Sequence, residues 1–354
     1  MSKLRVVQVG LGRWGFDWAR FVFPGHPDVE VAAVVDREEA PLQRAQTELG
    51  VPRGQCFRSL GEALAAVECE AVVSVLPIAL HAPAAAEALA AGKHVLTEKP
   101  FTETIRQARG LVSLAEASGR VLMVSQNYRY FPATQLAADF VRSAWLGALR
   151  QIKVDFRRNA LVEGYSYWAM PNPLVVDMAV HHFDLMRMIV GEDPTEVNCR
   201  TWNPPGSPFE SDPCGAMVIQ FPRGVVVSYR GSWLDQGPQT AWAGEWQMDF
   251  EQGTVMWTAR AEPPNRLRRD RFVIRRPNNE PEIEDLPPMP LHDRRGVLAA
   301  FAQAIRTGRD LQFFPSGRAN IGTLAVIAAA LRSAQAGGAS VRLDAILAEE
   351  DTDG

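Results

Sequence analysis

Three glycines and an aspartate near the start of the chain have the spacing of a phosphate-binding pattern. Residues 10–15 read Gly-Leu-Gly-Arg-Trp-Gly and lie between a short apolar run and a segment of helical composition. In a GxGxxG pattern the first glycine permits a tight turn, the second lets the backbone approach a diphosphate, and the third lets the helix pack on the strand. Asp36 follows 21 residues after Gly15, where a carboxylate can accept hydrogen bonds from a ribose diol. The residues predicted to bind a dinucleotide are therefore Gly10, Leu11, Gly12, Arg13, Trp14, Gly15 and Asp36.

The acidic residue at the end of the second apolar run bears on which dinucleotide binds. The Asp36 carboxylate would repel a 2′-phosphate, which favours NAD. Arg37 beside it keeps NADP possible, because a guanidinium can pair with that phosphate. The alternative for Arg37 is an exposed charge at the start of a helix.

A second group of polar residues lies on one predicted helix, residues 174–190. At about 100° per residue, Asp177, His181 and Asp184 fall within roughly 60° of one another, whereas His182 points about 140° away from Asp177. Asp177 and His181 are four residues apart, so the carboxylate can orient the imidazole. The alternative is a core histidine, and Asp184 could instead support His181 or Arg187.

A metal site is not predicted. His181, His182 and Asp184 do not share a helix face, and the chain has neither an HExxH sequence nor paired cysteines.

The elements that would position these residues differ between the two parts of the chain. In the first 125 residues, apolar runs alternate with helical segments, which predicts a parallel sheet covered by helices. The runs are residues 4–9, 29–35, 71–76, 94–96 and 121–124, and the helical segments are 13–23, 41–49, 82–91 and 104–118.

From about Asn127 the pattern changes. We predict a helix over residues 132–145, a strand over 149–157, the helix that carries His181, and an antiparallel meander. The meander comprises residues 195–202, 216–221, 225–229, 245–250 and 254–258, and two helices follow at 293–307 and 317–334. The predicted domains are 1–125 for dinucleotide binding and 126–354 for substrate binding and oligomerisation; a C-terminal helix can return to pack on the first domain.

Composition limits the class of protein. The chain has 354 residues, a formal net charge of −4 and 47% hydrophobic residues, which is typical of a globular protein with sizeable cores. The absence of a basic excess argues against nucleic acid as a partner. The longest uncharged stretch, residues 71–86, is interrupted by two prolines and a histidine. We therefore predict no membrane partner and a cytoplasmic location.

Further motifs point to a family. Thr97-Glu98-Lys99-Pro100 follows the fourth predicted strand, and Leu76-Pro77 with His81 lies upstream. Together with the glycine pattern and Asp177-xxx-His181-xx-Asp184, they resemble the Gfo/Idh/MocA family of NAD(P)-dependent oxidoreductases over nearly the whole chain. The resemblance implies an N-terminal Rossmann domain and a C-terminal α/β domain with a large, mostly antiparallel open sheet. It also implies a homodimer or homotetramer.

The resemblance also implies roles for individual residues. Glu98 would lie beside the cofactor, and Lys99 would project between nicotinamide and substrate, although a solvated loop lysine is the alternative. Asp177 and His181 would contact substrate hydroxyls, with His181 as an acid/base; the alternative is that Lys99 itself relays the proton. The remaining residues assigned in this way are Leu76, Pro77, His81 and Asn127 for the cofactor, and Arg129 for the substrate.

Some of these assignments have structural alternatives. Asn127 and Arg129 could equally be hinge hydrogen-bonders. Trp168 is a candidate substrate-binding residue, because with Tyr165 and Tyr167 it could stack on a sugar face; the alternative is packing at an interface or in the core. The sequence also departs from the family, because Ala179 stands where many relatives have glycine, which reduces backbone room near the substrate.

The resulting hypothesis is an NAD-dependent dehydrogenase acting on a secondary alcohol of a sugar, polyol or cyclitol. Two alternatives are a redox-neutral lyase or glycosidase that recycles bound NAD, and a dinucleotide-binding sensor without turnover. Net NADH production separates them.

Overall fold

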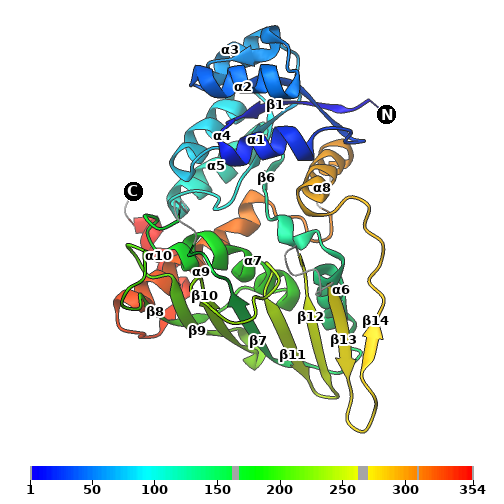
Figure 1. Ribbon diagram of the computed structural model, residues 1–354, viewed down its shortest axis with the longest axis vertical. Coiled ribbons are helices and arrows are strands. Elements are labelled where there is room, and N and C mark those ends of the chain that lie inside the picture. The colour runs from blue at the N-terminus through cyan, green and yellow to red at the C-terminus, as the bar shows by residue number, and fades with distance from the viewer. Residues whose placement is uncertain (1, 162–166, 262–269, 309–310, 353–354) are drawn as a thin grey trace. The chain divides into compact units, whose positions relative to one another are not determined.

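A computed structural model describes residues 2–161, 167–261, 270–308 and 311–352, and the chain forms two compact units (Figure 1). The first unit comprises residues 1–127 and 291–321, and the second comprises residues 128–290 and 322–354. The division after residue 127 lies two residues from the predicted one. Residues 291–321, which the prediction gave to the second domain, belong to the first unit.

The first unit is built on a six-stranded parallel sheet with the order β3-β2-β1-β4-β5-β6. Its inner strands are mostly apolar and buried because helices cover both faces of such a sheet. In β4, for example, all four residues are buried. The strands are β1 (Leu4–Val9), β2 (Val29–Val35), β3 (Cys56–Phe57), β4 (Ala71–Ser74), β5 (His94–Thr97) and β6 (Leu122–Val124). The order reverses between β1 and β4, and ligands of open α/β sheets bind at such a switch point.

Helices connect these strands. The predicted helix after the glycine pattern is present as α1 (Arg13–Asp17), which continues directly into a π-helical turn, η1 (Trp18–Val22). The short β3 and α3 (Leu60–Ala66) were not predicted. The other helical segments are α2 (Glu39–Leu49), η2 (Arg53–Gln55), η3 (Ile78–Leu80), α4 (His81–Ala90) and α5 (Ile105–Ser118).

The helix that returns to the first unit is α8 (Asp293–Thr307). Near its C-terminal end, the Arg306 guanidinium donates to Asp28 Oδ1 at 2.7 Å and to the Ser2 carbonyl oxygen at 3.0 Å. At its other end, Arg295 donates to the carbonyl oxygens of Val22 and Pro24, each at 2.9 Å. These contacts are why α8 belongs to the first unit although it follows the whole large sheet in sequence. The next helix, α9 (Gly317–Gln335), contains the division between units.

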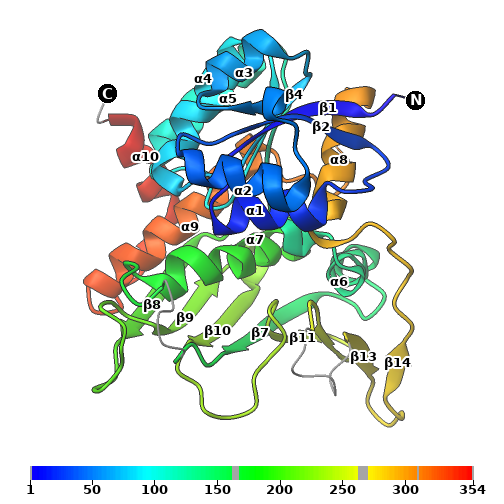
Figure 2. The same ribbon diagram turned by 45° about the horizontal axis from the view of Figure 1, so that its top comes forward.

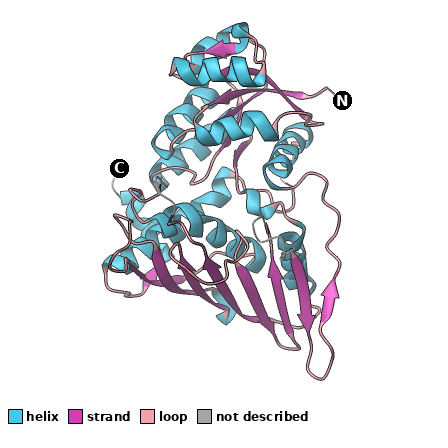
Figure 3. Cartoon of the chain, in the orientation of Figure 1, coloured by secondary structure: helices cyan, strands magenta, loops and turns pink. Residues whose placement is uncertain are grey.

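The second unit is built on a nine-stranded sheet with the order β14-β13-β12-β11-β7-β10-β9-β8-β15. Figure 3 draws strands in magenta and helices in cyan. All neighbours are antiparallel except β7 and β10. The predicted meander is therefore wrong at one point, because β7 lies between β10 and β11. The strands are β7 (Leu149–Arg157), β8 (Glu196–Trp202), β9 (Cys214–Gln220), β10 (Val226–Ser232), β11 (Glu245–Phe250), β12 (Thr254–Thr258), β13 (Arg271–Arg275), β14 (Glu282–Glu284) and β15 (Val341–Arg342).

Helices cover one face of this sheet (Figure 2). The strands show the alternation that this requires: in β11, Trp246, Met248 and Phe250 are buried and the residues between them are partly exposed. The helical segments of the unit are α6 (Pro132–Ser143), η5 (Leu174–Met178), α7 (Ala179–Val190), η6 (Pro222–Gly224), the later part of α9, and α10 (Leu343–Thr352). Strand β15 and helix α10 were not predicted. None of the helices within the described ranges has the length and apolar character needed to span a membrane.

Candidate functional site

The glycine pattern has the geometry that a dinucleotide requires. Gly10 has φ +95°, and a Cβ there would lie 2.2 Å from the Val75 carbonyl oxygen. A Cβ on Gly15 would lie 2.2 Å from the Gly10 carbonyl oxygen, so helix and strand approach too closely for any side chain. At Gly12, by contrast, a Cβ would meet nothing within 4 Å. This open backbone at the start of residues 13–22 leaves room for a diphosphate.

Asp36 lies at the end of β2 beside this turn. Its Oδ2 accepts a hydrogen bond from the Leu11 backbone N–H at 2.8 Å, and its Oδ1 accepts one from the Glu38 N–H at 3.0 Å. The structure thus brings Asp36 together with the glycine pattern. Arg37 forms an ion pair with Glu38 at 3.2 Å, and its side chain is 82% exposed. This geometry favours the surface role for Arg37.

The Asp36 carboxylate should select NAD through its charge. In Asp36→Asn, which keeps the size of the side chain, we expect NAD affinity to fall about tenfold and NADP affinity to rise, because the repulsion of a 2′-phosphate is lost. Titration of both nucleotides by fluorescence measures this. In Arg37→Ala, NAD binding should stay within about threefold of the wild type; a selective loss of NADP binding there would instead identify Arg37 as a 2′-phosphate ligand.

Lys99 lies two residues after the end of β5, and the Lys99–Pro100 peptide bond is cis. The preceding Glu98 is 6% exposed. Its Oε1 accepts hydrogen bonds from the indole N–H groups of Trp14 at 3.1 Å and Trp18 at 2.9 Å. Trp14 was predicted only as part of the glycine pattern and Trp18 not at all. The signal for the pair was their four-residue spacing on one helical segment.

His81 is buried at the start of α4, and both of its ring nitrogens face backbone carbonyls. Nδ1 lies 2.9 Å from the Pro100 oxygen, and Nε2 lies 2.8 Å from the Leu76 oxygen. His81 therefore ties the segment after β4, which includes Leu76 and Pro77, to the segment after Lys99. A direct cofactor contact by any of these three residues remains a prediction.

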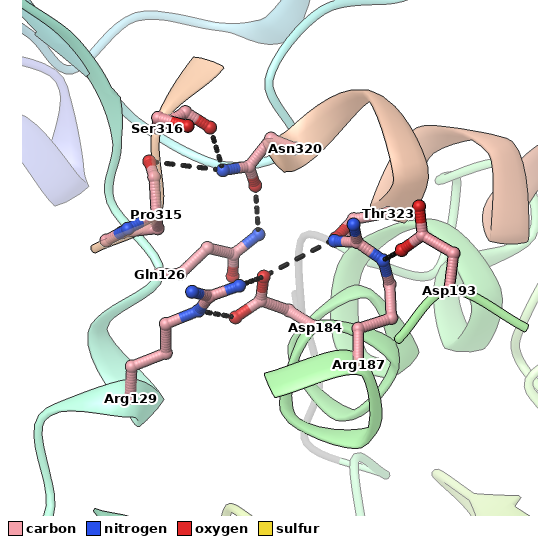
Figure 4. Close-up of polar contacts among 9 residues, drawn as sticks. All are labelled: Gln126, Arg129, Asp184, Arg187, Asp193, Pro315, Ser316, Asn320 and Thr323. Carbon is pink, nitrogen blue, oxygen red and sulfur yellow. Dashed lines mark hydrogen bonds and ion pairs between the residues drawn. The ribbon is translucent and has the colours of Figure 1, made fainter. Parts of the chain in front are cut away.

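The first unit also contains the predicted residue Asn127 and its neighbour Gln126, and both side chains are hydrogen-bonded. The Asn127 Nδ2 donates to Asp293 Oδ1. Gln126 Nε2 donates to Asn320 Oδ1 at 3.0 Å, and the Asn320 amide donates in turn to the carbonyl oxygens of Pro315 and Ser316 (Figure 4). Asn127 is buried and joined to α8, so the geometry supports a positioning role.

In the second unit, the helix with the acidic and histidine residues begins with a π-helical turn. Asp177 lies in that turn, η5, and His181 lies in the first turn of α7. His181 is 6% exposed. Its ring stacks on the ring of Tyr128, with the two centroids 4.1 Å apart and the ring planes inclined by 11°. Arg260 donates to the Tyr128 hydroxyl at 2.9 Å. Tyr128 was not predicted as a site residue, although it lies between Asn127 and Arg129.

Arg129 and Asp184, whose pairing was not predicted, form one buried ion pair (Figure 4). Arg129 donates through Nε to Asp184 Oδ2 and through Nη2 to Oδ1, both at 2.6 Å. Burial disfavours the charge, but the carboxylate outweighs it and raises the pKa of Arg129 above its ordinary value. The Thr323 hydroxyl donates to Asp184 Oδ1 at 3.4 Å and accepts a hydrogen bond from Arg187 at 2.8 Å, so Asp184 is linked to Arg187 through Thr323. Arg187 also contacts Asp193. The pair favours a positioning role for Arg129, and its contact with substrate remains a prediction.

His182 lies deeper in the unit, as expected from its angle on the helix. Its Nδ1 lies 3.1 Å from the Tyr229 hydroxyl, and its Nε2 lies 3.3 Å from the Trp242 carbonyl oxygen. Burial lowers the pKa of His182 to about 4. His182 is therefore a neutral core residue.

This depressed pKa should make stability depend on pH. Below the ordinary pKa of 6.5 the unfolded chain binds a proton at His182 that the folded chain does not, so stability is lost as pH falls toward 4. We expect this residue to cost about 2 kcal/mol of unfolding free energy between pH 7 and pH 5. Urea unfolding of wild type and His182→Asn across that range measures it. If the unfolding free energy of the two proteins falls in parallel with pH, the prediction is contradicted. His26 and His94, whose pKa values are also lowered by burial, contribute equally to the wild type and the variant and do not affect the comparison.

Trp168 is held by the backbone. Its indole N–H donates to the Ala160 carbonyl oxygen at 3.0 Å, and the neighbouring Tyr167 contacts Trp233 edge to face. Tyr165 lies outside the described residues. These contacts support packing as the role of Trp168, and stacking on a sugar remains a prediction.

Among the residues that the structure describes, no group of three histidine, cysteine or acidic side chains is arranged to hold a metal.

Fold and site thus define the class of protein as an α/β protein with a Rossmann-type dinucleotide-binding unit. Comparison with known proteins narrows this class. Residues 4–126 match the family described as "Oxidoreductase family, NAD-binding Rossmann fold", and residues 134–256 match the "GFO/IDH/MocA C-terminal domain". The chain therefore belongs to the Gfo/Idh/MocA family of oxidoreductases and has the NAD-binding domain of that family.

Several relatives show how far the similarity extends. Inositol 2-dehydrogenase 1 of Paenarthrobacter aurescens is 32% identical over 263 residues, which cover 72% of this chain and 74% of that protein. The dTDP-3,4-didehydro-2,6-dideoxy-alpha-D-glucose 3-reductase of Streptomyces violaceoruber is 27% identical over 294 residues, 80% of each chain. The crystal structure of an inositol dehydrogenase homolog from Azotobacter vinelandii, complexed with NADH and myo-inositol, has a TM-score of 0.81 at 19% identity, covering 96% of this chain and 98% of that one. This last comparison confirms the two-sheet fold.

Proposed function

We propose that the protein is an NAD-dependent dehydrogenase acting on a secondary alcohol of a sugar, polyol or cyclitol, or on the corresponding ketone in reverse. The observation that carries the proposal is the position of Lys99. It lies two residues after the end of β5, a strand of the same parallel sheet whose β1 leads into the glycine pattern, with only β4 between the two strands. A cationic side chain at the carboxyl end of this sheet is suited to hold an oxygen next to a bound dinucleotide.

The chemistry divides between the cofactor and the side chains. Bound NAD would supply the hydride acceptor, so that the carbinol carbon becomes a carbonyl carbon and NADH forms. Lys99 would donate a hydrogen bond to the substrate oxygen and stabilise its negative charge as the hydroxyl proton leaves. His181 would accept that proton, and its stacking on Tyr128 would fix the plane of the imidazole. Asp177, one helical turn before His181, would contact a substrate hydroxyl.

The substrate class is supported by the relatives. Their names include an inositol 2-dehydrogenase and a reductase of a nucleotide-linked deoxy-sugar. Both substrates carry a secondary alcohol or ketone on a six-membered ring, which is the group that the proposed chemistry requires.

The test is to incubate the purified protein with NAD and a panel of sugars, inositols and sugar acids, with NADP in parallel, and to follow absorbance at the NADH band. An increase in NADH absorbance with one or more members of the panel supports a dehydrogenase and narrows the range of possible substrates. Tight binding of NAD with no NADH from any member would favour a redox-neutral enzyme or a sensor. Failure to bind NAD would overturn the proposal altogether.

His181 should control the pH dependence of this reaction. In His181→Asn we expect kcat to fall about 100-fold, since the general base is lost, and the acidic limb of the pH–rate profile to flatten. The measurement is kcat from pH 5.5 to 9 for both proteins. If the variant keeps the wild-type profile at reduced rate, His181 has a packing role beneath Tyr128.

A further inference from the structure

Two indole rings converge on one buried carboxylate oxygen in the first unit. Trp14 and Trp18 both donate to Glu98 Oε1, at 3.1 and 2.9 Å. The other oxygen, Oε2, accepts a hydrogen bond from the Lys99 backbone N–H at 3.2 Å. A continuous chain of hydrogen bonds therefore runs from the two indoles through the Glu98 carboxylate to the backbone of Lys99.

The chain connects two parts of the dinucleotide-binding unit that are distant in sequence. Trp14 lies inside the glycine pattern, and Trp18 lies four residues later on the same helical segment, so their side chains share one face. Glu98 follows β5, which β4 separates from β1. The indoles therefore join the segment that faces the diphosphate to the segment that carries Lys99.

The two tryptophans differ in their surroundings. Trp18 is fully buried, whereas Trp14 is 40% exposed. The outer ring, Trp14, is covered by Arg294 from the start of α8, whose guanidinium carbon lies 4.3 Å from the ring centroid. An indole whose N–H points at a carboxylate has its ring face available to a cation. Trp18 thus fixes Glu98 from the core, and Arg294 holds Trp14 against it.

These hydrogen bonds stabilise the buried Glu98 carboxylate more than they would stabilise a neutral side chain. A buried carboxylate must be satisfied by donors, and an indole N–H is a donor without an acceptor that could compete. Removing one indole N–H would leave the carboxylate free to turn toward another donor. The hydrogen bond to the Lys99 backbone would then lose its fixed direction.

We propose that Trp14 and Trp18 are positioning residues for Lys99, and that binding of a dinucleotide at the glycine pattern is transmitted to Lys99 through Trp14 and Glu98. The proposal rests on the proposed role of Lys99 in the dehydrogenase reaction. Neither tryptophan touches the reacting atoms. Their function is to hold the backbone at Lys99 so that its ammonium group meets the substrate oxygen when the cofactor is in place.

The chain allows a direct test because it contains only four lysines, Lys3, Lys93, Lys99 and Lys153. Labelling with [13Cε]-lysine gives one NMR signal for each, and Lys99→Arg assigns the signal of Lys99. In the wild type, saturation with NAD should shift the Lys99 signal. In Trp14→Phe, which keeps a ring for Arg294 but removes the N–H, we expect that shift to fall to less than half, while the signals of Lys93 and Lys153 match the wild type.

Kinetics supply the second readout. Loss of one hydrogen bond to a charged group should lower kcat about tenfold in Trp14→Phe, with KM for NAD changed less than about threefold. Trp145→Phe is the matched control, because Trp145 is also exposed (48%) and also has an arginine, Arg276, over its ring. It should leave both the Lys99 signal and kcat unchanged. Glu98→Gln, which breaks the chain at its centre, should reproduce the effect of Trp14→Phe.

The outcomes separate this proposal from the proposed function. If Lys99 responds to NAD equally in the wild type, Trp14→Phe and Glu98→Gln, the positioning role is overturned even where the protein is an active dehydrogenase. If the variants lose the response and yet no alcohol yields NADH, the proposed function fails while the connection from Trp14 to Lys99 stands. A general loss of folding would move all four lysine signals and lower the melting temperature, and would also count against the proposal.

Discussion

Replacing Lys99 by methionine should lower kcat about 100- to 1,000-fold while leaving the affinity for NAD within about threefold of the wild type. Methionine preserves the length and most of the volume of the side chain but cannot donate a hydrogen bond. The donor would act mainly in the transition state, where charge develops on the substrate oxygen, so its loss should appear in kcat rather than in cofactor binding. The measurement pairs steady-state kinetics with fluorescence titration of NADH.

A second lysine in the same unit provides the control for this substitution. Lys93 precedes β5 as Lys99 follows it, and its Nζ donates to the Cys69 carbonyl oxygen at 2.9 Å. Lys93→Met removes the same charge from the other end of the same strand and should leave kcat unchanged. Unaltered kcat in Lys99→Met would remove Lys99 from the mechanism, and equal losses in both variants would indicate a general effect of charge.

The sequence predicted the first unit well because its elements are defined by local signals. The apolar runs of β1 and β2 are bounded as predicted, and the glycine pattern and Asp36 meet as their spacing required. Where the prediction failed, the cause was long-range. The short β3 is held in place by pairing with β2 rather than by its own apolar character. Helix α8 carries no local mark of the unit it joins, which is determined by contacts with Asp28, Val22 and Pro24.

The same distinction applies to the candidate site. Helical periodicity correctly separated His182 from Asp177 and His181, since a residue's angle on a helix is a local property. The partners of these residues were not predictable in this way. Arg129 and Asp184 are 55 residues apart, and Trp18 and Glu98 are 80 apart. The charges and donor groups of these side chains allow each pairing, but many other residues of the chain have the same chemistry. Only the fold brings such pairs together.

The buried pair of Arg129 and Asp184 should dominate the stability of the second unit. The exposed fractions of the two side chains are 7% and 1%, so neither charge is solvated when its partner is removed. Asp184→Asn should therefore cost about 3–5 kcal/mol of unfolding free energy. The loss should be smaller in Arg129→Met, because a buried carboxyl can be neutralised by taking up a proton whereas a guanidinium cannot lose one. Urea unfolding followed by intrinsic fluorescence measures both.

Two further variants decide whether burial of the charges causes the large loss of stability expected for the Arg129–Asp184 pair. Arg318 and Glu116 also approach to 2.6 Å, but their side chains are 69% and 54% exposed; Arg318→Ala should cost less than about 1 kcal/mol. The double variant Arg129→Met with Asp184→Leu replaces the buried charges by apolar groups and should regain most of the stability lost in Asp184→Asn. A double variant as unstable as Asp184→Asn would mean that the geometry of the pair, rather than the balance of buried charge, supports the packing of α7. In that case the correct positioning of the His181 helix would itself depend on the ion pair, and activity should fall in step with stability across the series.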